Sequence, residues 1–581
     1  MSNDTRIYEK ELDCQRREIR ILRLEAGSYS ADLSCNLKTA SLDDAPYYEA
    51  LSYAWGPTSD PQTISVNGTT ITVTRYLEIA LRHLRDSNTD RFLWIDAVCI
   101  DQKNVAERNS QVVLMGEIYR SAERVLVWIG EADDTSDMAF DLMPMIDINF
   151  IESPDASTVW SFFYNATRRP YMSRLWVIQE FVLARQDPLV LCGHKQALWS
   201  CFMSAYKTLA LDFFTQIDMV QEIATGRPPS VLAKLRYDLF DELRTTISQD
   251  GGADLRQLFI MSRSSIATDP RDRVYGLLQM LDMDDKKHFN VDYNKPTAVI
   301  YAEAMSLIFK QGGGPYFLSG MWCPSIPNPA IPDLPSWVPD FTSQTSQLTG
   351  SRPSSISFHP AFPRSVSGVG ADADNGKVLD DLKTLKVAVL HVDLVENVVH
   401  FENRLENCVA QLEEVEQRVL AARSKAIEND KLRSFFEKFR SSEPLWRTLV
   451  SGKSSRSGYD VAPDSYEVMY NELRQRPPTR NSQDPSSSSE YYLALESHLP
   501  NRTFFTTKCG FFGLGMPAVQ KGDEVTIWFG ATVPFVVRQS AQAPTKCSLI
   551  GPAYVAGIME GQMVDELYCD DLIDSKILYV I

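Results

Sequence analysis

Two carboxylates, Asp96 and Glu180, lie in segments where a charged side chain needs a physical reason. Asp96 interrupts a continuous apolar run. An isolated buried charge is very costly, so its side chain either faces a ligand or is held by an arginine such as Arg108. Glu180 follows Trp176 by four positions, so on a helix the two side chains share a face. The structural alternative for Glu180 is a carboxylate that pairs with Arg174 or caps a neighbouring loop.

Aromatic and polar residues accompany these carboxylates. Tyr53 and Trp55 share one face of an expected strand and could stack on a nucleotide base or ribose, although aromatic residues on a strand face more often belong to the core. Gln102 could line the same pocket as Asp96. Ser52 lacks the local signature of a nucleophile elbow, which argues against a Ser/His/Asp hydrolase.

The elements that must position these residues alternate between strands and helices. The strand over 48–55 ends at Gly56, and the pair Asn67-Gly68 predicts a type I′ turn in a hairpin. Further strands are expected over 92–100, 124–129 and 188–192, and helices over 107–122 and 173–184. This order predicts a doubly wound α/β domain over 46–195, built on a parallel sheet, with ligands beyond the carboxyl ends of the strands.

The remaining chain divides by composition into segments that flank this domain. Residues 1–45 hold strands that are expected to pack on it. The rest is predicted to form a helical region (196–310), a loop-rich segment (311–372), a helical segment (373–450), a disordered linker (451–490) and a small β unit (491–581). The expected fold class is therefore α/β, followed by a mainly helical region and a small C-terminal β unit.

Composition and charge argue against several classes of protein. The 581 residues carry a formal net charge of −18 with no long Lys/Arg run, so no nucleic-acid partner is expected. The ten cysteines and seven histidines show no zinc-site spacing, so no metal is expected, and the cysteines fit a reducing compartment. The polar N-terminus is unlike a signal peptide and no apolar run reaches membrane-spanning length, which predicts a cytoplasmic protein without a membrane span.

Three segments carry a resemblance to a known family: YEALSYAWG (48–56), LWIDAVCIDQ (93–102) and RLWVIQE (174–180). In this order they resemble the fungal heterokaryon-incompatibility (HET) domain. A helix from Gln111 and a strand ending at Gly130 lie between them, as in the family. Asp101 stands where the family usually has Asn, and Tyr171 stands where Trp is common. Downstream, DPRDRVYGLL (269–278) also resembles a segment of full-length family members.

The resemblance implies a role in non-self recognition and programmed cell death. The HET domain in turn resembles the TIR fold, a flavodoxin-like sheet whose enzymatic members carry a Glu on a helix after a Trp. This implies that Glu180 is catalytic and that NAD is cleaved at the nicotinamide–ribose bond. One carboxylate suffices, because nicotinamide leaves as a neutral molecule and a Glu can stabilise an oxocarbenium-like transition state. The substrate-binding residues expected around it are Ser52, Tyr53, Trp55, Gly56, Asp96, Gln102, Arg108, Trp176 and Gln179.

A non-enzymatic function is the alternative. The same domain could act as a signalling or interaction module that assembles with itself or with partner proteins. No cofactor is expected beyond NAD as a substrate. Nucleotide turnover that depends on Glu180 would separate the two functions.

Overall fold

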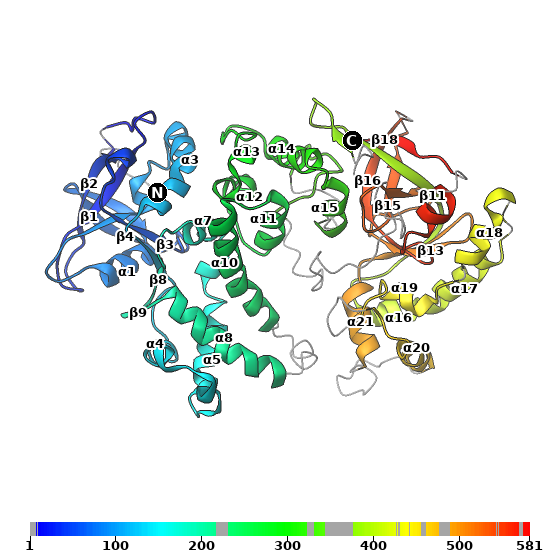
Figure 1. The fold of residues 1–581 in the computed structure, drawn as a ribbon, viewed down its shortest axis with the longest axis horizontal. Coiled ribbons are helices and arrows are strands. Elements are labelled where there is room, and N and C mark those ends of the chain that lie inside the picture. Colours follow the sequence, from blue (N-terminus) through cyan, green and yellow to red (C-terminus); the bar gives the residue numbers. More distant parts are fainter. Residues whose placement is uncertain are drawn as a thin grey trace. The chain divides into compact units, whose positions relative to one another are not determined.

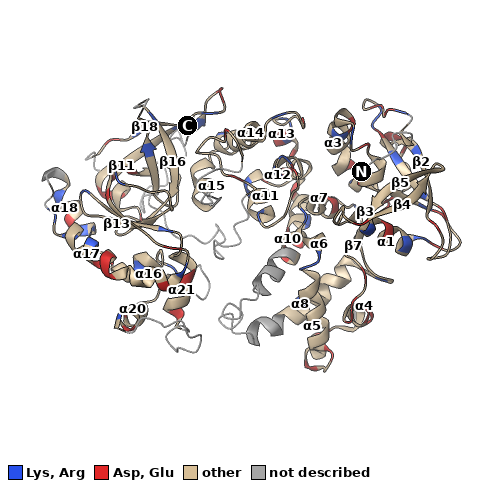
Figure 2. Cartoon of the chain, turned by 180° about the vertical axis from the view of Figure 1, so that it is seen from behind, with Lys and Arg blue, Asp and Glu red and all other residues tan. Residues whose placement is uncertain are grey.

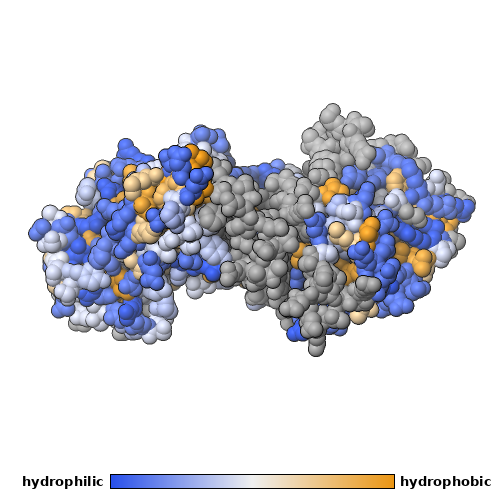
Figure 3. Space-filling model, turned by 90° about the horizontal axis from the view of Figure 1, so that it is seen from below, coloured by the Kyte–Doolittle hydropathy of each residue, from blue (hydrophilic) through white to orange (hydrophobic). Residues whose placement is uncertain are grey.

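The chain forms two compact units, residues 1–295 and 296–581 (Figure 1). The structure is a computed structural model, and it describes residues 7–581 apart from 9, 217–229, 322–330, 343–375, 426, 428–429, 441, 455–460, 476–488, 542, 544 and 569–572. Acidic and basic residues are interspersed over both units in Figure 2, and hydrophilic residues cover most of the described surface seen in Figure 3. Within the described ranges, no helix has the length and apolar character needed to cross a membrane.

The first unit is built on a nine-stranded mixed sheet with the order β5-β4-β2-β1-β6-β3-β7-β8-β9. Its strands are β1 (Glu18–Leu24), β2 (Ser34–Ser41), β3 (Glu49–Tyr53), β4 (Pro61–Val66), β5 (Thr69–Thr74), β6 (Arg91–Trp94), β7 (Arg124–Trp128), β8 (Leu189–Cys192) and β9 (Lys195–Leu198). The central strands β6, β3, β7 and β8 run parallel, whereas β1 and β9 pair antiparallel with β6 and β8. The α/β class is confirmed. The purely parallel sheet is not, because the N-terminal strands and the β4–β5 hairpin extend this same sheet.

The chain around Asp96 differs from the prediction. The strand expected over 92–100 stops at Trp94, the end of β6, and a short helix, α2 (Asp96–Cys99), follows. The Asp96 carboxylate accepts a hydrogen bond from Ala97 N, which stabilises the start of this turn. The next helix, α3 (Val105–Ser121), lies close to its expected place. Asp96 therefore begins a helical turn beyond the carboxyl end of β6 instead of lying inside a strand.

Helices make up most of the rest of the first unit. They are α1 (Arg75–Leu84), α4 (Ser136–Leu142), α5 (Ala156–Ala166), α6 (Pro170–Ser173), α7 (Trp176–Val182), α8 (Trp199–Gln216), α10 (Ser230–Asp250), α11 (Leu255–Ser262), α12 (Asp272–Tyr275) and α13 (Met283–Lys286). Phe181 of α7 packs on Trp199 of α8 and on Phe240 of α10, with ring centroids 4.5 and 5.0 Å apart. These aromatic contacts hold the short helix α7, which carries Glu180, against the longer helices.

The second unit contains a small closed β-barrel. Its ring is formed in order by β14 (Glu524–Trp528), β15 (Phe535–Gln539), β16 (Lys546–Pro552), β18 (Lys576–Val580) and β11 (Leu385–His400). β11 also pairs with β14, and this pairing closes the ring. Beyond a bulge near Asp393, β11 pairs with β12 (Thr503–Thr507), and this pairing contains a second bulge near Asn397. β12 pairs in turn with β13 (Phe512–Gly515), and β13 pairs with β17 (Tyr554–Val555). The long strand β11 therefore belongs both to the barrel ring and to the strands β12, β13 and β17.

The helices of the second unit are α14 (Thr297–Lys310), α15 (Gly314–Met321), α16 (Leu405–Ala410), α17 (Leu412–Arg423), α18 (Asp430–Phe439), α19 (Leu445–Leu449), α20 (Tyr466–Gln475) and α21 (Glu490–His498). The segment 373–450, predicted to be helical, begins instead with β10 (Lys377–Val378) and β11, because β11 has the alternating burial of a strand. The expected linker 451–490 contains α20, which buries Tyr466 and Tyr470 in the core. Its parts 455–460 and 476–488 lie outside the described residues.

Candidate functional site

Glu180 is a buried carboxylate beside strand β3. It is 1% exposed, and its Oε2 atom accepts a hydrogen bond of 2.6 Å from the Ser52 hydroxyl. The same hydroxyl lies 3.0 Å from the hydroxyl of Tyr171. The Tyr119 hydroxyl donates to Leu51 O at 3.1 Å and lies close enough to the Glu180 carboxylate to lower its pKa. Glu180 Oε1 has no hydrogen-bond partner among the described residues. One carboxylate oxygen can therefore still accept a hydrogen bond.

The protonation of Glu180 follows from this burial. Burial raises the pKa of Glu180 to about 7; the Arg174 cation opposes the rise, and the nearby Asp96 adds to it. Burial likewise raises the pKa of Asp96, again against the effect of Arg174. A carboxyl whose pKa is raised toward neutrality suits a group that binds a ligand hydroxyl or transfers a proton.

Asp96 is held by three neighbouring groups. Its Oδ2 atom accepts a hydrogen bond from Trp55 Nε1 at 2.8 Å, and its Oδ1 atom accepts one from Ala97 N at 2.7 Å. The side-chain amide of Gln102 donates to Asp96 O at 2.9 Å. Asp96 is only 7% exposed, whereas Trp55 is 37% exposed. Of these two, the indole is the one that meets solvent.

Arg174 is the cation of this site, and the sequence pointed to it only as a structural partner of Glu180. Its guanidinium donates to Tyr53 O, and its Cζ atom lies 5.7 Å from the centroid of the Trp55 ring. It acts on both carboxylates, because it lowers the pKa of each against the effect of burial. The signal that could have found it is its place at the start of RLWVIQE, the segment that ends at Glu180.

The side chains of three predicted residues form no hydrogen bond or ion pair with Asp96 or Glu180 within the described part of the chain: Arg108, Trp176 and Gln179. The guanidinium of Arg108 lies 4.1 Å from the centroid of the Tyr293 ring instead of holding the carboxylate of α2. Trp176 Nε1 donates to the Asp272 carboxylate at 3.0 Å, so the two residues expected to share a face of α7 have different partners. Gln179 is completely buried, and its side-chain amide has no partner among the described residues.

Gly56 shapes the loop that leaves β3. Its φ angle is +72°, and a Cβ atom there would lie 2.4 Å from the ring of Tyr76, so glycine is needed at this position. Tyr53 is buried, and its hydroxyl has no partner among the described residues. The predicted residues that the fold gathers around Arg174 are Ser52, Tyr53, Trp55, Asp96, Gln102 and Glu180.

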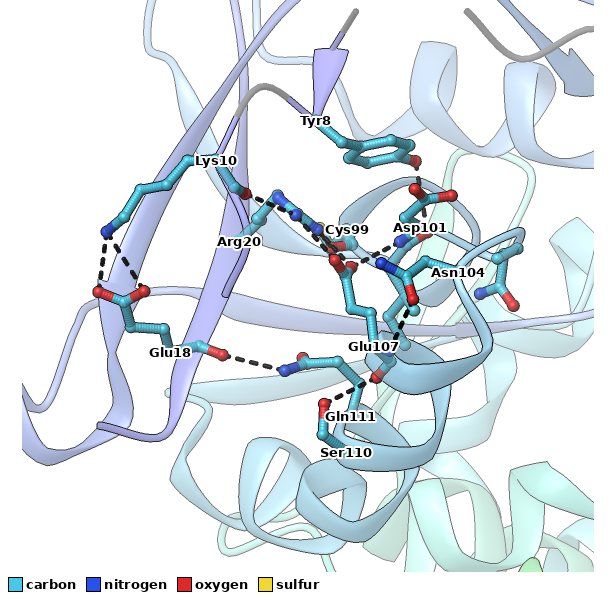
Figure 4. Close-up of polar contacts among 12 residues, drawn as sticks. Tyr8, Lys10, Glu18, Arg20, Cys99, Asp101, Asn104, Glu107, Ser110 and Gln111 are labelled. Atoms are coloured by element: carbon cyan, nitrogen blue, oxygen red, sulfur yellow. Dashed lines mark hydrogen bonds and ion pairs between the residues drawn. The ribbon is translucent and has the colours of Figure 1, made fainter. Parts of the chain in front are cut away.

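A buried ion pair fixes the loop that follows Asp96 (Figure 4). Arg20 of β1 donates from both terminal nitrogens to the carboxylate of Glu107, at 2.5 and 3.0 Å, and both side chains are nearly fully buried. Arg20 also donates to Cys99 O at 3.1 Å, and Glu107 accepts from Asp101 N at 2.7 Å. The N-terminal strand therefore holds the loop that positions Asp96.

The chemistry open to this site is that of two carboxylates and one arginine. The carboxylates can accept hydrogen bonds from sugar hydroxyls and stabilise positive charge that develops beside them, and Arg174 can bind an anionic group. Within the described residues, no group of three or more His, Cys, Asp or Glu side chains could hold a metal ion.

Comparison with known proteins gives the family. The family model "Heterokaryon incompatibility protein (HET)" matches residues 48–180, the stretch that holds every residue gathered around Arg174. Residues 48–180 form a HET domain. A second family model, "Het-6 beta-barrel domain", matches residues 409–573, which contain most strands of the barrel in the second unit. The expected resemblance to the HET family is therefore confirmed.

This chain is also similar, along nearly its whole length, to one curated relative. "Heterokaryon incompatibility protein 6, OR allele" from Neurospora crassa is 24% identical, and the match covers 95% of each chain. No solved structure matches.

Proposed function

We propose that this HET domain protein acts in heterokaryon incompatibility, and that the site at Glu180 cleaves NAD in a process that ends in cell death. The first part is supported by the HET match over 48–180 and by the relative named as a heterokaryon incompatibility protein, which is similar over 95% of both chains. The second part is supported by one observation above all. The Glu180 carboxylate is buried close to Arg174 and Asp96, and the charges of these two residues shift its pKa in opposite directions.

The order of the parallel strands also supports a ligand site at their carboxyl ends. β6, β3, β7 and β8 are the second, first, third and fourth parallel strands along the chain, and this is the order of a flavodoxin-like sheet. In such sheets a ligand lies beyond the carboxyl ends, at the point where the strand order reverses. Ser52 lies near the end of β3, which borders this reversal, and Asp96 lies just beyond the end of the neighbouring strand β6. Both residues therefore lie at the carboxyl ends of the parallel strands.

The chemistry needs only a single carboxylate. Nicotinamide leaves from a cationic precursor as a neutral molecule, so no general acid is required. Water then forms the new bond to C1′ of the ribose and releases a proton, which gives ADP-ribose. The ionised Glu180 would bind ribose hydroxyls and stabilise the oxocarbenium-like transition state, and its buried surroundings strengthen that interaction. Arg174 would attract the pyrophosphate, because guanidinium groups bind phosphate oxygens well.

Substrate entry requires a rearrangement, since Glu180 is 1% exposed. Trp55 is the exposed member of the site, and it is tied to Asp96 by one hydrogen bond. We expect assembly of the protein with itself or with a partner protein to move this residue and open the site.

Nicotinamide release from NAD by the full chain at high protein concentration tests the enzymatic function. Glu180→Gln keeps the size of the side chain but removes its charge. Glu117→Gln, which alters a carboxylate on α3 that is 42% exposed, is the matched control. We expect release by the wild type and by the control, and at least a hundredfold less by Glu180→Gln. Equal release by all three, or none from folded and assembled wild type, would contradict NAD cleavage at Glu180.

A non-enzymatic interaction module is the second candidate, and the closed state of Glu180 is the observation that favours it. Expression of the wild type and of the same two variants in a filamentous fungus separates the two candidates. Cell death that persists with Glu180→Gln, at equal protein level, would favour killing by assembly alone.

A further inference from the structure

Asp272, far outside the residues matched by the HET family model, touches the helix that carries Glu180. It is the first residue of α12 and is 9% exposed. Its Oδ2 atom accepts a hydrogen bond from Trp176 Nε1 at 3.0 Å, and its Oδ1 atom accepts one from the Tyr293 hydroxyl at 2.5 Å. One carboxylate thus joins the first residue of α7 to a segment more than one hundred residues downstream.

Backbone contacts reinforce this connection just before α7. Leu175 N donates to Ile266 O at 2.9 Å, and Ile266 N donates to Ser173 O at 2.6 Å. These bonds form a parallel bridge between Ile266 and Arg174, the cation of the site. The segment around Ile266 therefore fixes the backbone of Arg174, while Asp272 fixes the next turn of the chain.

Residues of helix α3, within the HET domain, hold Tyr293 in place. Its ring lies under the guanidinium groups of Arg108 and Arg271, whose Cζ atoms are 4.1 and 5.2 Å from the ring centroid. Its backbone N–H donates to Asn109 Oδ1 at 3.2 Å. Since Arg108 and Asn109 belong to α3, the hydroxyl that meets Asp272 is held in place relative to α3.

We propose that Asp272 is a positioning residue for the HET-domain site. It holds the start of α7 so that Arg174 and Glu180 keep their places beside Asp96. Helix α7 has seven residues, and so short a helix is not stable without outside contacts. The functional unit therefore extends past residue 180 to the segment 266–293. The proposal rests on the proposed function only in taking Glu180 as the catalytic group.

The consequence of losing Asp272 is local to α7. In Asp272→Asn one carboxylate oxygen is replaced by an NH2 group, so either the indole N–H of Trp176 or the hydroxyl of Tyr293 loses its acceptor. Breaking a hydrogen bond to a charged group weakens the local structure by about tenfold to a hundredfold in its opening equilibrium. Backbone amides of residues 173–182 should then exchange with solvent faster by that factor.

Hydrogen exchange of the full chain, measured by mass spectrometry, tests this for Asp272→Asn. The matched control is Asp254→Asn, because Asp254 caps α11 and pairs with Arg256 in the same helical region. Trp176→Phe removes the hydrogen bond from its other end and serves as a second variant. We expect faster exchange in 173–182 for Asp272→Asn and Trp176→Phe, but not for the control, together with at least tenfold slower nicotinamide release.

Unchanged exchange in 173–182 for both variants would overturn the proposal, and so would a uniform increase over the whole first unit. The result is independent of the enzymatic function. If wild-type protein releases no nicotinamide, NAD cleavage fails, whereas the positioning role of Asp272 is still decided by the exchange of α7.

Discussion

Replacing Glu180 by Gln should change how the stability of the chain depends on pH. Burial raises the pKa of Glu180 to about 7, against 4.5 for an ordinary Glu. Between these pH values the unfolded chain has released a proton that the folded chain keeps. The stability from this group is therefore complete below about pH 4.5 and is lost as pH rises through about 7. Gln does not titrate, so the variant escapes this loss.

The size of the effect follows from the difference between the two pKa values. The difference is about 7 − 4.5 = 2.5 units, and each unit corresponds to about 1.36 kcal/mol, which gives about 3 kcal/mol. The free energy of unfolding of Glu180→Gln minus that of the wild type should thus rise by about 3 kcal/mol between about pH 4.5 and about pH 8.

Urea unfolding of the full chain at several pH values, followed by tryptophan fluorescence, measures this difference. Glu117→Gln, with its carboxylate 42% exposed, is the control and should follow the wild type at each pH. A difference that stays flat for Glu180→Gln would refute the reasoning. A difference that falls with pH would show that attraction between Arg174 and the charged Glu180 outweighs burial.

Two further predictions concern other buried features. Arg20→Met should destabilise the first unit by about 3–5 kcal/mol, because Glu107 would be left buried without its partner, and adding Glu107→Leu should restore most of the loss in urea unfolding. Gly557→Ala should lower the melting temperature of the barrel far more than Gly522→Ala. Both have positive φ angles, which cost about 1–3 kcal/mol in alanine, but only at Gly557 would the Cβ atom meet backbone, at 2.0 Å from an oxygen of α18. Equal losses in differential scanning calorimetry would contradict the steric part of this argument.

Features set by local geometry could be predicted from the sequence. The type I′ turn at Asn67-Gly68 is confirmed by φ angles of 51° and 73°, since these residue types adopt positive φ readily. Ser52 and Asp96 come close to one site because they lie at the carboxyl ends of neighbouring parallel strands, β3 and β6. Chain order and strand direction were enough to predict this.

Features set by distant partners could not be predicted. Trp176 and Arg108 were expected at the site, but they meet Asp272 and Tyr293, and hydrophobic spacing contains no information about contacts over such separations. The mixed sheet was missed for the same reason, because the period of a strand does not tell which edge it joins. β11 belongs to a barrel whose other strands lie more than one hundred residues further along the chain.

The closure of that barrel has a consequence for the time course of synthesis. β11 begins at Leu385, and its partner β18 begins at Lys576, about 190 residues later. A ribosome adds about 5–20 residues per second, so roughly 10–40 s pass between the appearance of the two strands. Throughout that interval one edge of β11 is unpaired, and an open strand edge can pair with another chain. Nascent chains of this protein should therefore pair with one another through this strand edge more readily before β18 is synthesised than after.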